Sequence, residues 1–332
     1  MNSKRKRPRW YYKRRERAKV DNEKKLAKFA EKTVRILGKP YENNKLGRKP
    51  ELSPYQATIL ILVMVALDKT FREAANTAYI LFGKEVSYVS IWRYYRKLPE
   101  EYLHRAVKVL FKILTERSPH VLLFLIMDST GISFERRDGW SKNHIIAAWL
   151  RKEHLIPIAS CEATENTIAD ITVGYKFITE INLNGFKTKI YLLADSAFYS
   201  KKLRTKAFRR GFIPMVKEKK TALLSRRNLY EFDENIYTFR KVIEGIFGGT
   251  SIRYGNKTRC ILEEHRRKWV ILMNVAHNLR EWMCLEAYSY SNHDREIFFY
   301  AKFKLYERYL KAVVLMLFIR DSLRTSPILK QT

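Results

Sequence analysis

The stretch that decides the fold is VLLFLIMDS at residues 121–129, where an uninterrupted apolar run stops at an acid, Asp128. A second stretch, IYLLADS at residues 190–196, repeats the pattern and stops at Asp195. Short, continuous apolar runs are typical of strands that are covered on both faces of a sheet. A carboxylate at the end of such a strand is poorly solvated unless it meets a cation. The two runs therefore predict a buried sheet that carries an acid at two of its strand ends.

A third acid follows in YTFRKVIEGIFG at residues 237–248, a segment with the pattern of a helix. Tyr237, Arg240 and Glu244 form a Y-x2-R-x3-E spacing, which places their side chains near one helical face. Carboxylate oxygens suit Mg²⁺ or Mn²⁺. Two such ions about 4 Å apart clamp the attacking and leaving oxygens of an in-line phosphoryl displacement. The residue types therefore predict that this glutamate and the two aspartates bind divalent metal ions for phosphodiester chemistry.

Each acid alone has a plainer explanation. An aspartate after a strand is often a turn former or a helix cap, and a glutamate on a helix is usually a solvated side chain. The combination is more specific, because both aspartates follow apolar strands and the glutamate comes with a tyrosine and an arginine. Arg240, one helical turn before Glu244, is expected to orient the Glu244 carboxylate or to bind a DNA phosphate, with an ordinary ion pair along the helix as the alternative. Tyr237 is expected to pack.

These residues resemble the catalytic signature of DDE transposases from prokaryotic insertion sequences. The resemblance covers roughly residues 122–247 and implies an RNase H-like domain, in which the aspartates end the first and fourth strands and the glutamate lies on a later helix. It also implies that Asp128, Asp195 and Glu244 hold two Mg²⁺ or Mn²⁺ ions. One position departs from the family pattern, because the lysine that often follows the glutamate by seven residues is Ser251 here.

The resemblance implies a DNA transposase that cuts DNA at the ends of a mobile element and joins the exposed 3′-hydroxyl to target DNA. The expected partners are the terminal inverted repeats and target DNA. An element has two ends, so a homodimer on DNA is expected. Two other functions stay open: an RNase H-like DNA nuclease without strand transfer, and a non-enzymatic DNA-binding protein derived from a transposase. The presence of all three acids argues against the second of these.

The net charge of +31 over 332 residues indicates a polyanionic partner. Nucleic acid is the leading candidate, and an acidic membrane surface is the other. DNA is favoured because the basic residues interleave with a folded pattern instead of lining one amphipathic helix. No run reaches the ~18 apolar residues of a membrane span, and no signal-peptide pattern opens the chain. Since the three cysteines also lack metal-site or disulfide spacing, a cytoplasmic, nucleoid-associated protein is expected.

The N-terminal part divides into two regions. Residues 1–50 are expected to form a basic arm, disordered in structure, that contacts DNA phosphates. Residues 51–118 are expected to be all-helical, with one helix opening at Ser53-Pro54 and a second ending at Gly83. A third helix follows a short turn, which is the order of a helix-turn-helix region, although a plain helical hairpin has the same pattern. The DNA-facing candidates on this third helix are Arg93, Tyr94, Arg96 and Lys97.

Residues 119–290 are expected to form the catalytic domain. Its order of three neighbouring strands, a helix, then strand–helix–strand predicts an α/β fold with an RNase H-like mixed sheet flanked by helices. Only 49 residues separate Asp195 from Glu244, too few for an inserted domain. The expected strands are 121–128, 144–149, 156–162, 190–194 and 212–216; the expected helices are 167–181, 200–210 and 269–287, with a turn-like segment at 248–260.

Residues 291–332 are expected to form a C-terminal helix. This helix is expected either to mediate dimerisation or to pack against the catalytic domain of its own chain. One face of it would carry Ile297, Phe298, Ala301, Leu305, Tyr309 and Val313.

Overall fold

The fold is described from a computed structural model. The structure describes residues 9–43, 49–117, 124–135, 139–150, 155–181, 190–218, 232–255, 257–258, 260 and 262–290. Residues 1–285 form one compact unit, and residues 286–332 form a second. The expected C-terminal helix at 291–332 therefore lies outside the described residues. None of the helices that the structure describes is long and apolar enough to cross a membrane.

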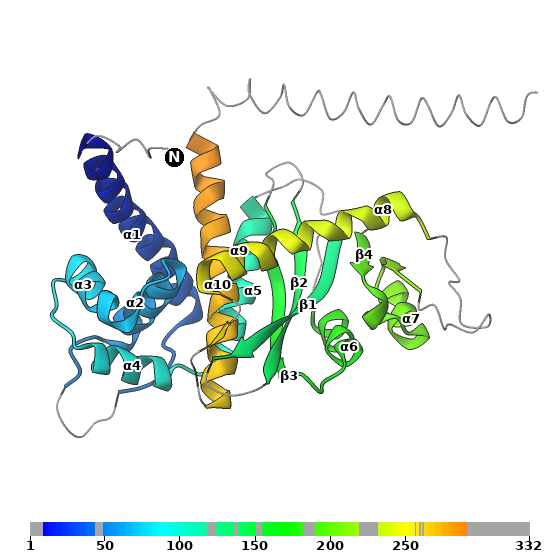
Figure 1. Cartoon of the computed structure of the whole chain (residues 1–332), viewed down its shortest axis with the longest axis horizontal. Helices are drawn as coiled ribbons and strands as arrows, with labels where there is room; N and C mark the ends of the chain where they lie inside the picture. The colour runs from blue at the N-terminus through cyan, green and yellow to red at the C-terminus, as the bar shows by residue number, and fades with distance from the viewer. Residues whose placement is uncertain are drawn as a thin grey trace, which may run out of the picture. The chain divides into compact units, whose positions relative to one another are not determined.

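The described part of the chain opens with helices, and a mixed sheet follows (Figure 1). The helices are α1 (Arg9–Leu37), α2 (Pro54–Ala66), α3 (Phe71–Phe82), α4 (Tyr88–Lys97) and α5 (Glu100–Arg117). The elements of the sheet region are β1 (Phe124–Phe134), β2 (Trp140–Trp149), β3 (Ile158–Glu165), α6 (Asp170–Glu180), β4 (Ile190–Ala194), η1 (Ser196–Phe198), α7 (Lys201–Arg209), β5 (Phe212–Val216), α8 (Glu234–Thr238), η3 (Phe239–Ile243), α9 (Glu244–Tyr254), β6 (Lys257–Thr258) and α10 (Glu263–Tyr290).

Local capping chemistry sets the ends of the helices at 53–97 where the sequence predicted them. The Ser53 side chain accepts a hydrogen bond from the backbone of Gln56, which reciprocates in a capping box at the start of α2. Helix α3 ends at Gly83, whose φ of 63° is the left-handed conformation that glycine adopts without strain. The Ser87 side chain then caps α4. The predicted order of helices is therefore confirmed.

The N-terminal segment differs from the expected disordered arm. Residues 9–37 form α1, and Leu26, Phe29, Ala30 and Val34 on it are buried. These residues recur at helical spacing and pack against α2 and α5. The buried ring of Trp282 on α10 stacks on Phe29. The expectation of disorder is thus wrong for this helix, because an apolar stripe runs beneath the many charged residues.

The sheet has the strand order β3-β2-β1-β4-β5, and β6 pairs with β1 outside this path. β2 runs antiparallel to both β1 and β3, whereas β4 runs parallel to β1, and β5 runs parallel to β4. This is the order of an RNase H-like fold, and it confirms the predicted class. Helix α5 packs on β3, and α7 packs on β5.

Two details of this region differ from expectation. Asp128 does not end its strand, because β1 continues to Phe134 through antiparallel pairing with β2. What ends near Asp128 is the parallel pairing with β4, whose last partners are Met127 and Ala194. The segment expected to be turn-like is helical up to Tyr254, where α9 ends before Gly255.

Helix α10 joins the layers through buried amides. Asn143 of β2 and Asn274 exchange hydrogen bonds of 3.3 and 2.9 Å. The side chain of Asn278 accepts from the backbone N–H of Ile158 and donates to its carbonyl, both at 2.8 Å, and it also reaches the carbonyl of Val107 on α5. A single asparagine thereby satisfies both backbone groups of a residue on β3, the strand at one end of the sheet path.

Candidate active site

The register of two parallel strands brings the predicted aspartates together. Met127 on β1 pairs with Ala194, the last residue of β4, and Asp128 and Asp195 directly follow these two paired residues. Neighbouring strands lie about 4.8 Å apart. The charge of Asp195 acts on the titration of Asp128, as the proximity of the two carboxylates requires. The fold therefore pairs two of the three predicted acids.

A backbone N–H orients each of these carboxylates. The N–H of Ser129 donates to Oδ1 of Asp128 at 2.8 Å. The N–H of Ala197 donates to Oδ1 of Asp195 at 2.9 Å, which makes Asp195 the cap of the short η1 helix. At Asp128 the contact is made by the backbone N–H of Ser129. The backbone just after each aspartate therefore fixes the orientation of its carboxylate.

Arg240 supplies a positive charge to this pair. Its Nη1 lies 2.5 Å from Oδ2 of Asp128, and the two side chains are 21 % and 14 % exposed. Burial raises the pKa of Asp128 above its usual value. The Ser129 N–H and the Arg240 guanidinium oppose that rise, whereas the charges of Asp195 and Asp170 add to it. Arg240 thus orients the carboxylate of Asp128, whereas the sequence predicted that it would orient the carboxylate of Glu244.

Tyr237 lies beside the same group. The Arg240 guanidinium is 6.0 Å from the centre of its ring, which also packs against Phe232 at 5.2 Å. Burial raises the pKa of Tyr237, and the charges of Asp195 and Asp128 add to this. The tyrosine and the arginine of the Y-x2-R-x3-E pattern therefore both face the aspartates.

Glu244 is placed differently. It is exposed, as the first residue of α9, directly after the 3-10 segment Phe239–Ile243. In an α-helix four residues turn about 40° past one full turn, whereas in a 3-10 helix they turn about 120° past it. The 3-10 segment therefore rotates Glu244 away from the face that carries Arg240. Its role as a metal ligand stays a prediction.

Three polar residues of the site region were not predicted from the sequence. Asp170, in the first turn of α6, accepts a hydrogen bond from Lys142 at 3.1 Å, and its charge acts on Asp128. The buried His144 lies 3.4 Å from the same carboxylate through Nδ1, and its Nε2 is 2.8 Å from the hydroxyl of Thr164. Burial lowers the pKa of His144 to about 4, so the ring is neutral at pH 7. An aspartate at a helix start gives no sequence signal beyond a favourable helix dipole.

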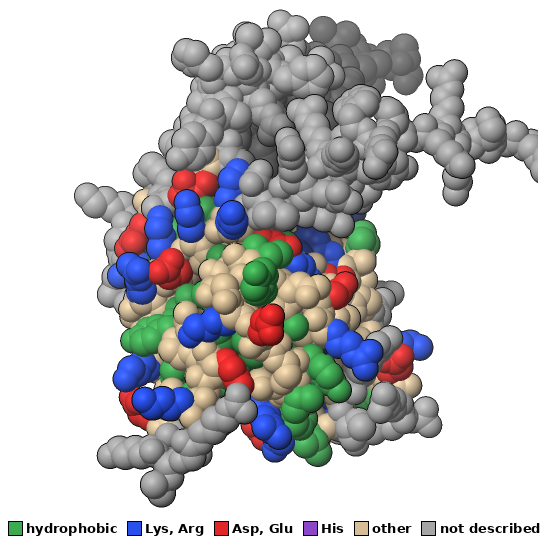
Figure 2. Space-filling model, turned by 90° about the vertical axis from the view of Figure 1, so that its left-hand side faces the viewer, with side chains coloured by type: hydrophobic (Ala, Val, Ile, Leu, Met, Phe, Trp, Pro, Cys, Tyr) green, Lys and Arg blue, Asp and Glu red, His purple; other side chains and the backbone are tan. Residues whose placement is uncertain are grey.

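The predicted DNA contacts lie apart from this site, on α4. Arg93, Arg96 and Lys97 are exposed, whereas Tyr94 is buried and its hydroxyl donates to a carboxylate oxygen of Glu51. The DNA-facing role of all four stays a prediction. Figure 2 shows Lys and Arg side chains spread among acidic and hydrophobic ones on the left-hand face of Figure 1. The described surface on this side therefore offers scattered basic groups rather than one patch of a single sign.

Comparison with known proteins agrees with this geometry. The family described as "Transposase DDE domain" matches residues 119–279. These residues belong to the transposase DDE domain family. The match extends past the signature to most of α10, and it confirms the resemblance as well as the function class, a DNA transposase. A search of curated proteins gave no match.

A solved structure provides a more distant likeness. The chain is similar to a piggyBac transposase synaptic complex with hairpin DNA determined by cryo-EM, with 10% identity, a TM-score of 0.41, and coverage of 94% of this chain and 80% of that one. A likeness of this size carries no argument about the site. The fold assignment rests on the strand order of the sheet.

DDE transposases generally use divalent metal ions, and the residues present fit that chemistry in part. Asp128 and Asp195 offer adjacent, oriented carboxylate oxygens, which are the ligands that Mg²⁺ and Mn²⁺ prefer. Within the described residues, no three His, Cys, Asp or Glu side chains are arranged to hold a metal ion. The aspartate pair thus fits a divalent cation, whereas Glu244 as placed does not complete a set of three ligands.

Proposed function

We propose that this transposase cuts DNA at the ends of a mobile element and joins the cut strand to target DNA. Asp128 and Asp195 would form the active site for both steps. The observation that carries the proposal is the pairing of these two oriented carboxylates in a transposase DDE domain. When bound there, divalent cations, two in number as the resemblance implies, activate a hydroxyl nucleophile and neutralise charge on the phosphoryl oxygens.

The residues of the chain have distinct tasks in this proposal. Asp128 and Asp195 present negative oxygens that backbone N–H groups hold in place. Arg240 compensates the charge of Asp128 and fixes the direction of its carboxylate. Glu244 is proposed as the third ligand. It reaches the aspartates only if the segment Phe239–Ile243 turns, because its present place at the start of α9 is exposed.

A second function is favoured by that same exposure of Glu244. A transposase-derived protein that binds DNA without cutting it would not need a third ligand at the aspartate pair. A nuclease that cuts without joining is the other alternative, and the geometry of the site does not separate it from a transposase, because cleavage and joining are both in-line displacements at phosphorus.

The test is cleavage and strand transfer on DNA that carries the two ends of the element, with Mg²⁺ present. Asp128→Asn, Asp195→Asn and Glu244→Gln should each nearly abolish cleavage and leave DNA binding largely intact, because the amide keeps the shape and removes the charge. Glu234→Gln, an exposed carboxylate on α8, is the matched control and should cut normally. Near-normal turnover by any of the three would remove that residue from the site, and absence of cleavage by the unchanged protein would favour the DNA-binding function.

DNA binding and assembly complete the proposal. Arg93, Arg96 and Lys97 are exposed on α4, and we propose that they contact the terminal inverted repeats. A homodimer on DNA follows from the need to act on two ends. Light scattering with and without end DNA tests it, since a single protein per complex that still joins both ends would contradict a dimer.

A further inference from the structure

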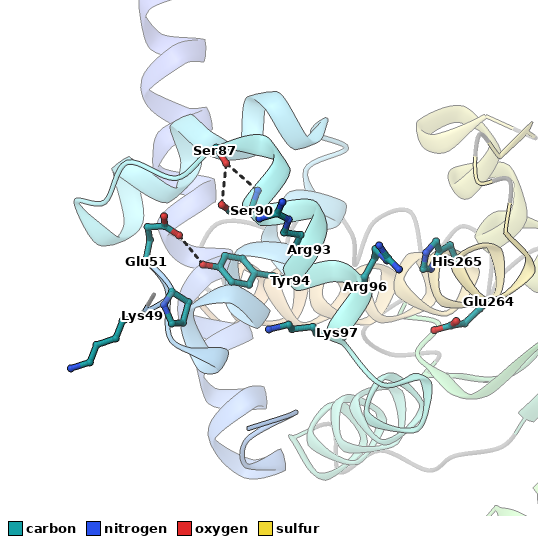
Figure 3. A pocket seen from close by; sticks show the side chains of 11 residues that line it. Lys49, Glu51, Ser87, Ser90, Arg93, Tyr94, Arg96, Lys97, Glu264 and His265 are labelled. Carbon is teal, nitrogen blue, oxygen red and sulfur yellow. Dashed lines mark hydrogen bonds between the residues drawn. The ribbon is translucent and has the colours of Figure 1, made fainter. Parts of the chain in front are cut away.

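A cleft of about 820 Å³ lies between α4 and the first turn of α10 (Figure 3). Four basic and two acidic side chains line the cleft, so its net charge is positive. The basic residues are Lys49, Arg93, Arg96 and Lys97, and the acidic ones are Glu51 and Glu264. Ligand pockets for small molecules are predominantly apolar, and this charged lining instead suits an anion.

The inner wall of the cleft carries the side chain of a buried histidine, His265. His265 is 9 % exposed, and within the described residues neither ring nitrogen has a hydrogen-bond partner. The centre of its ring lies 5.8 Å from the centre of the Tyr95 ring, so the ring is packed, but this contact gives its nitrogens no hydrogen-bond partner. A buried polar group that lacks a partner costs about 1–3 kcal/mol. Such a group at the wall of a cleft marks a place where a ligand supplies the missing bond.

Both walls of the cleft are fixed to each other. The hydroxyl of Tyr95 on α4 donates to the carbonyl of His265 on α10 at 2.7 Å. In the reverse direction, Nζ of Lys268 donates to the carbonyl of Arg96 at 3.0 Å. Figure 3 shows the side chains of Arg96 and His265 directed toward the space between the helices, and the charge of Arg96 acts on the His265 ring. The cleft is therefore formed before a ligand arrives, which reduces the entropy lost on binding.

We propose that this cleft seats a phosphate group of the DNA backbone, with an N–H of His265 donating to a phosphate oxygen and Arg93, Arg96 and Lys97 supplying the charge. The inference rests on the proposed function, and it adds that α10 of the DDE domain shares this phosphate with the helix-turn-helix region. Free inorganic phosphate has the same chemistry. A DNA phosphate is favoured because the cleft is continuous with the exposed basic residues of α4, on a chain with a net charge of +31.

The experiment measures the affinity of the full chain for duplex DNA by fluorescence anisotropy over a range of salt concentrations. His265→Phe keeps the ring packing and removes the donor, so DNA binding should weaken about 10-fold. The salt dependence should stay unchanged, because a neutral histidine displaces no counterion. Arg96→Ala should instead reduce the slope of log K against log salt by about 0.9, the share of one phosphate contact.

Matched controls separate these effects from general ones. Arg105→Ala removes the same charge from an exposed position on α5, and His104→Phe makes the same ring change away from the cleft. Both should bind DNA like the unchanged protein. His265→Gln retains an N–H donor and should keep most of the affinity. If neither His265 variant folds, the salt slope of Arg96→Ala decides the matter.

Three results would overturn the inference. One is unchanged affinity in folded His265→Phe, and another is an unchanged salt slope in Arg96→Ala. A third is inorganic phosphate that binds in the cleft at constant ionic strength without weakening DNA binding, which would assign the cleft to a free anion. Failure of the unchanged protein to bind any DNA would instead contradict the proposed function itself, so the two failures are distinguishable.

Discussion

The ion pair between Arg240 and Asp128 leads to a quantitative prediction about stability. Arg240→Ala leaves the Asp128 carboxylate, whose side chain is 14 % exposed, without the guanidinium that lies 2.5 Å away. Removing one partner of a fully buried pair costs about 3–5 kcal/mol, and an exposed pair contributes at most about 1 kcal/mol. Since both side chains here keep part of their exposure, we expect the free energy of unfolding to fall by about 2 kcal/mol at pH 7.

The loss should depend on pH in a defined direction. Burial already raises the pKa of Asp128 in the folded protein, and without Arg240 this pKa should rise further. A carboxyl group whose pKa is raised by folding stabilises the folded state at low pH and loses that contribution as the pH rises through the raised pKa. The deficit of the variant should therefore be largest near neutral pH and should shrink toward about pH 4, where protonation removes the uncompensated charge.

Urea unfolding at several pH values measures both effects. Lys241→Ala, an exposed cation in the same 3-10 segment, is the control and should change stability by less than about 0.5 kcal/mol. Mn²⁺ should stabilise Arg240→Ala more than the unchanged protein, because a cation at Asp128 then replaces the missing charge. Equal stability of the variant and the unchanged protein at pH 7 would refute the reasoning, and so would a deficit that grows as the pH falls.

Three further predictions concern stability and binding. Asn278→Ala should lower the free energy of unfolding by about 2–3 kcal/mol, measured in urea, because two backbone groups of Ile158 lose their partner. Lowering the pH from 7 to about 5 should reduce the free energy of unfolding by about 2 kcal/mol, because the folded pKa of His144, about 4, lies below its unfolded value. This part of the pH dependence should be absent in His144→Gln. DNA affinity should drop about 10³–10⁵-fold from about 50 to about 200 mM salt, and deletion of residues 1–19 should make that dependence shallower in anisotropy titrations.

Much of the fold could be predicted from local chemistry. The Ser53 cap, the Gly83 terminator and the alternation of apolar runs with helical patterns each act within a few residues, so a single sequence displays them. The same holds for the aspartates, because an apolar strand run ends at each of them. Their adjacency could be expected only from the resemblance, since it depends on the register between β1 and β4.

What the sequence could not show depends on contacts between distant segments. The extension of β1 beyond Asp128 comes from pairing with β2, along residues that no longer form an uninterrupted apolar run. The sequence did not predict α1, because charged residues dominate its composition, whereas its stability comes from burial against α2 and α5. The rotation of Glu244 comes from a 3-10 segment, and helical periodicity in a sequence does not distinguish five residues of 3-10 helix from α-helix.

Helix α10 connects α4, where we propose that DNA binds, to the sheet that carries Asp128. Its first turn is tied to α4 through His265 and Lys268. Its middle is tied to β2 through Asn274. The rise of α-helix from His265 to Asn274 is about 14 Å. The helix-turn-helix region and the sheet are therefore held at a fixed separation by one rigid element, instead of being joined by a flexible linker. A phosphate bound between α4 and α10 would then set the position of the DNA with respect to Asp128 on β1, the neighbour of β2.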